Sequence, residues 1–374
     1  MRENLKISET KYMNKARITK FISKSGSTSK TEISRSLGIS MPTTLQYVKE
    51  LTDSGIVEEQ GAYESTGGRK AKVLSIKGDA GYAAGVDITS NHIAMVMVNA
   101  RKEKILWKRE RETFCNEIPY YRRLESYILD FIKESGVPRE KIKGIGFSVP
   151  GIVDKEKILI LRSHILKVQN VSFQSLCEKL NCPCSIENDA NCAAYAEFEN
   201  SREEKNAVYL SLSNTVGGAI YLGNHLYEGE HFKSAEFGHM IVEKNGKTCY
   251  CGKKGCLDAY CRAGILLEEG YKNLEEFFHA LRGKEEKAVK IWREYMENLS
   301  IGVSNLRTIF DCDIILGGYV GGYLGEFMFE LEEAIKKYNI FDTDSTYIKT
   351  GKYKLEASAC GAAFQFIDRF LNFI

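Results

Sequence analysis

The chain has 374 residues, of which 43% are hydrophobic and 27% are charged, with only 5 prolines. This length predicts two or three compact domains of roughly 150 residues each, and the composition excludes long disordered tracts. No apolar run approaches the ~20 residues that a membrane-spanning helix needs, and the polar start MRENLKISET is unlike a signal peptide, so we expect a cytoplasmic protein without membrane contacts.

The 11 cysteines are an odd number scattered along the chain. With no export signal, this pattern favours reduced thiols and one metal cluster over a disulfide framework. The net charge is +2, but residues 1–78 hold 14 Lys and Arg against 8 Asp and Glu. Such asymmetry favours a nucleic-acid-binding module joined to a neutral or acidic domain, although a solvated basic face would give the same charge.

Three short helices are predicted before residue 56. The first ends near Gly26, and the capping box SKTE at 29–32 opens a second helix that stops at Gly38. Ser40 is a good N-cap for a third helix, which continues to Gly55. Their buried faces are predicted from residues at helical spacing, namely Ile18, Phe21, Ile22, Ile33, Leu37, Thr44, Val48 and Leu51. Two short helices joined by a tight turn are typical of a DNA-reading helix-turn-helix.

The start of the third helix is predicted to face DNA through four solvent-side residues: Met41, Thr43, Gln46 and Lys49. Gln46 is the best candidate for a base-edge contact. Strands around 56–60 and 73–76 then form a wing, in which Arg69 and Lys70 offer charge to phosphates or to the minor groove. The alternative is a three-helix module that binds another protein.

The remainder of the chain alternates strands and helices in two sets, which predicts mixed sheets covered by helices. The first set comprises strands within 82–110, a helix over 118–135, a strand at 142–148, a helix at 172–180, a strand at 184–187 and a helix from Asp189. The second comprises strands at 207–212 and 216–222, a cysteine-rich loop, helices within 274–310, a strand at 314–316 and a last helix over 356–371.

The strongest motif is GHMIVEKNGKTCYCGKKGC, which contains His239, Cys249, Cys251 and Cys256. Three thiolates and one imidazole at this spacing can bind Zn²⁺ tetrahedrally, and four protein ligands leave no open position for chemistry. We therefore expect a structural zinc ion, whose ligation would stabilise the loop by roughly 10 kcal/mol if it resembles a zinc finger. The alternative is four unrelated buried residues. Cys261 lies outside the spacing and is expected to be a core thiol.

Several further motifs follow one another in a fixed order: STGGRK at 65–70, GIGFSVPGIVD at 144–154, ENDANCAAYAE at 187–197, SAEFGHM at 234–240, GCLDAY at 255–260, LGGYVGG at 316–322 and ACGAA at 359–363. With the cysteine motif, they resemble the ROK family of repressors, open reading frames and kinases over nearly the whole chain. The resemblance is to the transcriptional repressor branch, which includes xylose and N-acetylglucosamine repressors.

The resemblance implies an α/β protein in which a winged helix-turn-helix precedes a two-lobed actin-like, ribonuclease H-like ATPase or sugar kinase fold with a sugar cleft. The expected domains are the DNA-binding domain at 1–78, a first lobe at 79–196 completed by 356–374, and a second lobe with the zinc loop at 197–355. The implied sugar-binding residues are Asn188, Asp189, Glu236, His239 and Asp258.

Two of these sugar-site residues carry an additional expectation. Asp258 stands where the family usually has Glu, so its side chain is one methylene shorter. His239 would bind zinc through one ring nitrogen and leave the other free for the sugar.

Kinases of this family use the residue at Asp189 as a general base and hold ATP phosphates in glycine-rich turns. Here residues 87–91 read DITSN where such kinases resemble D-x-G-G-T, and residues 213–215 read SNT where they begin Gly-Thr-Gly. Side chains at these positions block the approach of a phosphate to the backbone, so ATP binding is predicted to be poor. The glycine pairs at 217–218 and 317–318 remain, although a Gly-Gly turn is also ordinary loop chemistry.

The sequence thus favours a non-catalytic, sugar-responsive transcriptional regulator, a repressor of carbohydrate-utilisation genes. It would bind double-stranded operator DNA and a small-molecule sugar as a homodimer or homotetramer. Two alternatives remain open: an ATP-dependent sugar kinase that carries a DNA-binding domain, with Asp189 catalytic, and a zinc-stabilised scaffold with neither ligand.

Overall fold

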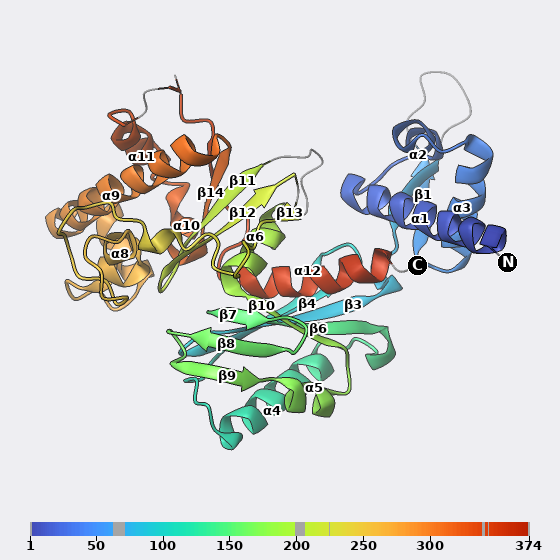
Figure 1. The fold of residues 1–374 in the computed structure, drawn as a ribbon, viewed down its shortest axis with the longest axis horizontal. Coiled ribbons are helices and arrows are strands. Elements are labelled where there is room, and N and C mark those ends of the chain that lie inside the picture. The colour runs from blue at the N-terminus through green and yellow to red at the C-terminus, as the bar shows by residue number, and fades with distance from the viewer. Residues whose placement is uncertain are drawn as a thin grey trace. The chain divides into compact units, whose positions relative to one another are not determined.

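The computed structural model describes residues 2–62, 72–198, 206–223, 225–338, 341–342 and 344–372. The chain divides into two compact units, whose elements are labelled in Figure 1. Unit 1 consists of Met1–Asn188, Glu199–Arg202 and Ala359–Ile374, and unit 2 of Asp189–Phe198 and Glu203–Ser358. None of the helices in the described ranges combines the length and apolar character that crossing a bilayer requires.

The first elements of unit 1 are three helices and a two-stranded sheet: α1 (Arg2–Ser25), α2 (Lys30–Leu37), α3 (Met41–Asp53), β1 (Val57–Ala62) and β2 (Lys72–Ile76). The strands pair antiparallel. The side chain of Ser29 accepts a hydrogen bond from the Glu32 amide at the start of α2, and Ser40 does the same for Thr43 in α3. The predicted capping residues therefore begin both helices.

The core of this helical segment is the predicted one. Six of the expected positions are buried, namely Ile18, Ile22, Ile33, Thr44, Val48 and Leu51, while Phe21 and Leu37 are half-buried. Gly38 adopts a left-handed conformation with φ of 64° and ends α2. A side chain is strained there, and the turn brings α3 back against α2.

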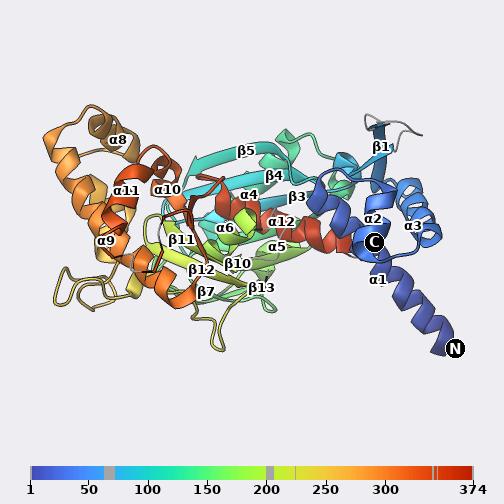
Figure 2. The same cartoon turned by 90° about the horizontal axis from the view of Figure 1, so that it is seen from above.

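The main sheet of unit 1 has the strand order β10-β6-β3-β4-β5, and Figure 2 shows β3, β4 and β5 running side by side. Its strands are β3 (Tyr82–Ile88), β4 (His92–Asn99), β5 (Lys104–Arg111), β6 (Ile142–Val149) and β10 (Cys184–Asn188). β3, β4 and β5 pair antiparallel, whereas β6 is parallel to both β3 and β10. The predicted mixed sheet is confirmed for this unit.

Helices cover both faces of this sheet (Figure 1). On one face, α4 (Ile118–Glu134) and α5 (Gln174–Leu180) contribute buried apolar side chains to a core shared with β3, β4 and β6. On the other face lies α12 (Ala357–Asn372), which approaches closely. A Cβ added to Gly85 would lie 1.8 Å from the Ala359 carbonyl oxygen, and one added to Gly146 would lie 2.3 Å from that of Ala362. These glycines permit the helix to pack on the strands.

Unit 1 also contains a three-stranded antiparallel sheet that the sequence did not predict: β7 (Ile152–Asp154), β8 (Leu159–Ser163) and β9 (Val168–Ser172). Two short 3₁₀ helices, η1 (Gly78–Ala80) and η2 (Arg139–Lys141), complete the described part of this unit. The strands of the small sheet are only three to five residues long, which is too short for a clear alternating pattern.

The sheet of unit 2 has the order β13-β12-β11-β14-β15. Its strands are β11 (Ala207–Leu212), β12 (Val216–Leu222), β13 (His225–Leu226), β14 (Asp313–Gly317) and β15 (Ile348–Thr350). The described helices are α6 (Asp189–Phe198), α7 (Asp258–Cys261), α8 (Leu274–Arg282), α9 (Glu286–Phe310), α10 (Gly318–Leu324) and α11 (Met328–Ile335), with the 3₁₀ helices η3 (Phe237–His239) and η4 (Ala263–Leu267). Sequence analysis missed β13, β15, α7, α10 and α11.

The core of unit 2 contains an aromatic cluster formed by side chains of α8, α9 and α10. Phe278 packs edge-on against Trp292 and stacks on Tyr323 with ring centroids 4.1 Å apart, while Trp292 stacks on Tyr295. Such contacts add to the area that each ring buries. Cys261 is buried in the same core, which confirms its prediction as a core thiol.

Candidate functional site

The exposed face of α3 carries the residues predicted to meet DNA. Met41, Gln46 and Lys49 are exposed, whereas Thr43 is half-buried and shares a hydrogen bond with the Ser40 hydroxyl at 2.7 Å. The Gln46 side-chain amide donates to Glu50 Oε1 at 3.1 Å. An exposed amide can both donate and accept, so Gln46 retains the chemistry of a base contact.

The base of the wing is held by charged side chains. Lys30 Nζ lies 2.7 Å from Glu59 Oε1, and Lys72 contacts the other oxygen of the same carboxylate. These hydrogen bonds hold the pKa of Glu59 below its usual value. Arg101 Nε donates to the Ile76 carbonyl at 2.7 Å. Arg69 and Lys70, the predicted wing contacts, lie outside the described residues.

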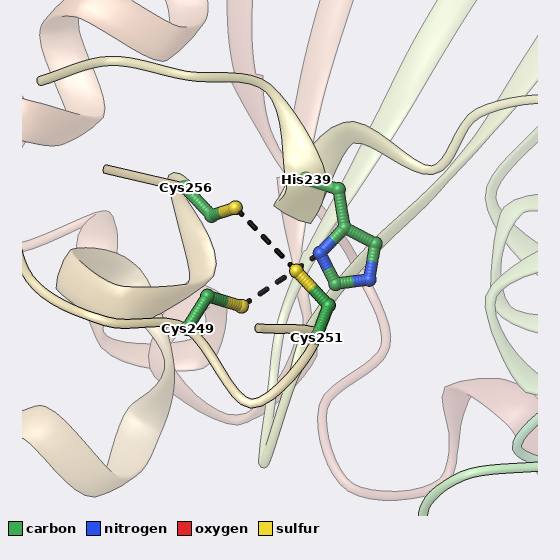
Figure 3. Close-up of side chains that lie close together, drawn as sticks. All are labelled: His239, Cys249, Cys251 and Cys256. Atoms are coloured by element: carbon green, nitrogen blue, oxygen red, sulfur yellow. Dashed lines mark hydrogen bonds between the residues drawn. The ribbon is translucent and has the colours of Figure 1, made fainter. Parts of the chain in front are cut away.

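The four predicted zinc ligands meet in one cluster in unit 2. One ligand atom from each of His239, Cys249, Cys251 and Cys256 lies within 4.8 Å of the others, and Figure 3 shows all four side chains pointing inward. Cys251 Sγ is 3.8 Å from Cys256 Sγ, and Cys249 Sγ is 3.8 Å from His239 Nδ1. Tetrahedral Zn²⁺ with Zn–S bonds of about 2.3 Å places two sulfurs about 3.8 Å apart, so the four residues fit this ion.

The cysteine loop turns tightly at a glycine, and two of its thiols are buried. Gly255 has φ of 82°, and an added Cβ would lie 1.7 Å from the Glu243 carbonyl oxygen, so only glycine fits this turn. Burial raises the pKa of the Cys249 thiol to about 12 and also raises the pKa of Cys256. A bound divalent cation would reverse this preference, because it ligates thiolates and releases their protons.

Tyr250, between two of the cysteines, was missed by sequence analysis. Its hydroxyl lies 3.2 Å from His239 Nε2, and the two rings meet edge to face at 5.3 Å. Burial raises the pKa of Tyr250, and the carboxylates of Asp258 and Glu236 raise it further. The second nitrogen of His239, which we predicted to be free for a sugar, is therefore hydrogen-bonded to a neighbouring side chain. The position of Tyr250 between Cys249 and Cys251 was the sequence feature that could have identified it.

The remaining predicted sugar residues differ in their surroundings. Asp258 begins α7 and is only 2% exposed; its Oδ1 accepts a hydrogen bond from the Val216 amide at 2.7 Å. Burial raises the pKa of Asp258, and this hydrogen bond opposes the shift. Glu236 is exposed and directly precedes η3. Unit 2 thus brings Glu236, His239 and Asp258 near Tyr250.

Asn188 and Asp189 are consecutive, at the point where the chain passes from unit 1 to unit 2. Asn188 ends β10, and its side-chain amide donates to the Gly151 carbonyl at 3.0 Å. Asp189 begins α6, where its Oδ1 accepts from the Ala190 amide at 3.0 Å. A carboxylate at a helix start is favoured by the helix dipole.

A hydroxyl side chain in each of the two altered turns accepts backbone hydrogen bonds. Between β3 and β4, Thr89 Oγ1 accepts hydrogen bonds from the amides of Asn91 and His92 at 3.4 and 3.0 Å. After β11, Ser213 Oγ accepts from the Tyr319 amide at 3.4 Å. Three backbone amides in and beside these turns, those of Asn91, His92 and Tyr319, are thus paired within the chain.

Three of the four glycines at 217–218 and 317–318 have a structural reason. A Cβ on Gly218 would lie 2.2 Å from the ring of Phe237, and one on Gly317 would lie 2.2 Å from the Tyr209 hydroxyl. Gly318 has φ of 79°, in the region that favours glycine. Packing or backbone conformation thus explains Gly218, Gly317 and Gly318, whereas a Cβ on Gly217 would lie 3.4 Å from the Ala190 Cβ, an ordinary contact distance.

The ROK family profile matches residues 83–369, and a profile described as winged helix-turn-helix DNA-binding matches residues 15–58. The chain belongs to the ROK family. Among its ROK relatives, the xylose repressor of Caldicellulosiruptor bescii is 28% identical over 393 residues, which cover 97% of each chain. The xylose repressor of Bacillus subtilis is 31% identical over 261 residues, covering 69% of this chain and 68% of that protein.

A solved structure of a ROK family transcriptional regulator, described as a homologue of Escherichia coli Mlc, has the same overall fold. It matches with a TM-score of 0.76 at 19% identity and covers 97% of both chains. The predicted fold class, a winged helix-turn-helix followed by an actin-like ROK domain, is therefore confirmed.

Proposed function

We propose that this ROK protein is a sugar-responsive, non-catalytic transcriptional repressor that binds operator DNA. The observation that carries the proposal is the union in one chain of a winged helix-turn-helix with a ROK domain. The family relatives reported above are named xylose repressors, which supports a repressor of carbohydrate-utilisation genes and makes a pentose the first effector to test.

The hydrogen bonds in the turns at 87–91 and 213–215 support a regulator rather than a kinase. Thr89 Oγ1 accepts from the His92 amide of its own turn, and Ser213 Oγ accepts from the Tyr319 amide at the start of α10. The glycines at 218 and 317 accommodate the rings of Phe237 and Tyr209. A γ-phosphate would have to displace these hydrogen bonds before it could reach the backbone. Poor ATP binding follows from this arrangement.

We assign the sites as follows. Base and phosphate contacts come from Met41, Thr43, Gln46, Lys49, Arg69 and Lys70, and sugar contacts from Asn188, Asp189, Glu236, His239 and Asp258. Zn²⁺ would be held by His239 Nδ1 and the thiolates of Cys249, Cys251 and Cys256, where it would supply a structural cross-link. Carboxylate and amide groups suit a polyol because each hydroxyl both donates and accepts.

The proposed domain organisation is a DNA-binding domain at 1–78, a first lobe at 79–196 completed by 356–374, and a second lobe at 197–355. A winged helix-turn-helix commonly reads two half-sites as a dimer, so we propose a homodimer or homotetramer in the cytoplasm, where the operator is. Sugar binding would change operator affinity by a coupling of about 1–3 kcal/mol, and operator DNA would change sugar affinity by the same factor.

Operator binding measured by fluorescence anisotropy, with and without D-xylose, tests the proposal. Asp189→Ala should bind DNA normally and lose its response to the sugar. The double variant Arg69→Ala/Lys70→Ala should bind the sugar normally, while its operator affinity falls and the slope of log K against log salt becomes less steep.

Two outcomes would overturn these assignments. If Asp189→Ala responds to D-xylose as the wild type does, the sugar site is placed wrongly; if the double variant keeps its salt slope, the wing does not contact DNA. Release of ADP from ATP in the presence of D-xylose would identify a kinase instead of a regulator.

A further inference from the structure

The loop that carries the cysteines also presents one aromatic side chain to the predicted sugar residues. Tyr250 follows Cys249 and precedes Cys251, so a metal ion held by both cysteines would fix its backbone. The side chain remains 53% exposed. Among the described residues, the hydrogen-bond partner of its hydroxyl is His239 Nε2, at 3.2 Å.

The direction of this hydrogen bond follows from the cluster geometry. His239 Nδ1 faces the sulfurs, 3.8 Å from Cys249 Sγ, and a metal-binding nitrogen uses its lone pair for the metal. The proton of the neutral ring is then on Nε2, so Nε2–H donates to the Tyr250 oxygen. A tyrosine hydroxyl that accepts one hydrogen bond keeps its own proton to donate.

The surroundings of this hydroxyl suit a polyol. Glu236 is exposed and directly precedes η3, the 3₁₀ helix that ends at His239, and Asp258 begins α7, two residues after Cys256. Asp258 Oδ1 is already occupied by the Val216 amide, and its side chain is buried. A ligand above this loop would therefore meet the tyrosine hydroxyl and the Glu236 carboxylate, one as a donor and the other as an acceptor.

We propose that Tyr250 is a direct sugar-binding residue, whose hydroxyl donates a hydrogen bond to one sugar oxygen while it accepts from the metal-bound His239. This inference rests on the proposed sugar-binding function and replaces a direct contact of His239 with a contact through Tyr250. The zinc loop then has a second role, because it sets the position of a ligand-binding hydroxyl.

Isothermal titration of the full-length, zinc-loaded protein with D-xylose tests the inference. Tyr250→Phe keeps the ring and removes the hydroxyl, so the affinity should fall about three- to tenfold, as expected for one neutral hydrogen bond. Tyr227, an exposed tyrosine of the same unit, supplies the matched control, because Tyr227→Phe should bind as the wild type does. Zinc content, measured colorimetrically after the thiols are blocked, should be equal in all three proteins.

The same titrations with the monodeoxy analogues of D-xylose locate the contact. The loss caused by Tyr250→Phe should disappear for the one analogue that lacks the contacted oxygen and persist for the others. An equal loss with every analogue, an unchanged affinity for D-xylose, or a higher affinity in Tyr250→Phe would each overturn the direct contact. A wild-type protein that binds none of the tested sugars would instead refute the sugar-binding function itself.

Discussion

Asp87 offers a quantitative test of how unit 1 tolerates a buried carboxyl group. It lies near the end of β3, is 7% exposed, and accepts a hydrogen bond from the Ser148 hydroxyl at 2.6 Å. Burial raises its pKa to about 6, although the hydrogen bond from Ser148 and the charge of Arg109 oppose the shift. The charged form is therefore unfavourable in the folded protein.

The sign of the pH dependence follows directly. The pKa of Asp87 is 3.8 in the unfolded chain and about 6 in the folded protein. Between these two pH values, Asp87 still holds a proton in the folded protein that it has released in the unfolded chain. The contribution of Asp87 to the free energy of unfolding therefore falls as pH rises through this window. The free energy of unfolding falls by up to about 3 kcal/mol across this window, because one pKa unit corresponds to about 1.4 kcal/mol.

Asp87→Asn should remove this pH-dependent loss of stability, while the amide oxygen can still accept a hydrogen bond from Ser148. We expect the variant to be more stable than the wild type at pH 7.5, with an advantage about 1–2 kcal/mol larger than at pH 5. Urea unfolding followed by circular dichroism at both pH values measures the difference. Asp79→Asn is the control. Hydrogen bonding to Lys141 lowers the pKa of Asp79, so this variant should not gain stability relative to the wild type between pH 5 and pH 7.5. Parallel pH profiles for Asp87→Asn and the wild type would refute the reasoning.

Two further predictions concern the metal and the packing of α12. A zinc chelator should lower the unfolding temperature of the wild type but not that of Cys256→Ser, in differential scanning fluorimetry; equal responses would contradict a structural metal. Gly85→Ala places a Cβ 1.8 Å from the Ala359 carbonyl oxygen, so we expect a loss of about 1–3 kcal/mol in urea unfolding. Gly325→Ala, where nothing lies within 4 Å, should be nearly neutral, and equal effects of both substitutions would rule out the packing argument.

Local signals sufficed for the features whose physics is local. Ser29 and Ser40 cap α2 and α3 as predicted, because a capping side chain bonds an amide only two or three residues away. The cysteine and histidine motif was recognisable for the same reason, since all four ligands lie within one short loop and metal ligation tolerates few other residue types.

Features that depend on residues far apart in the sequence could not be predicted from local signals. The short strands β7, β8 and β9 are defined by pairing with one another. The residues that precede α10 and α11, Gly317 and Phe327, provide no capping side chain. The environment of Asp258 depends on Val216, which is 42 residues away in the sequence.

The same division holds within the candidate site. The family resemblance predicted that residues 236, 239 and 258 contact a sugar, because the motifs preserve the side-chain chemistry at these positions. Only the folded chain brought the Tyr250 hydroxyl onto His239 Nε2 and placed Phe237 against Gly218. Side-chain chemistry is a property of each residue, whereas the partner of a hydrogen bond and the reason for a glycine depend on which atoms the tertiary structure places nearby.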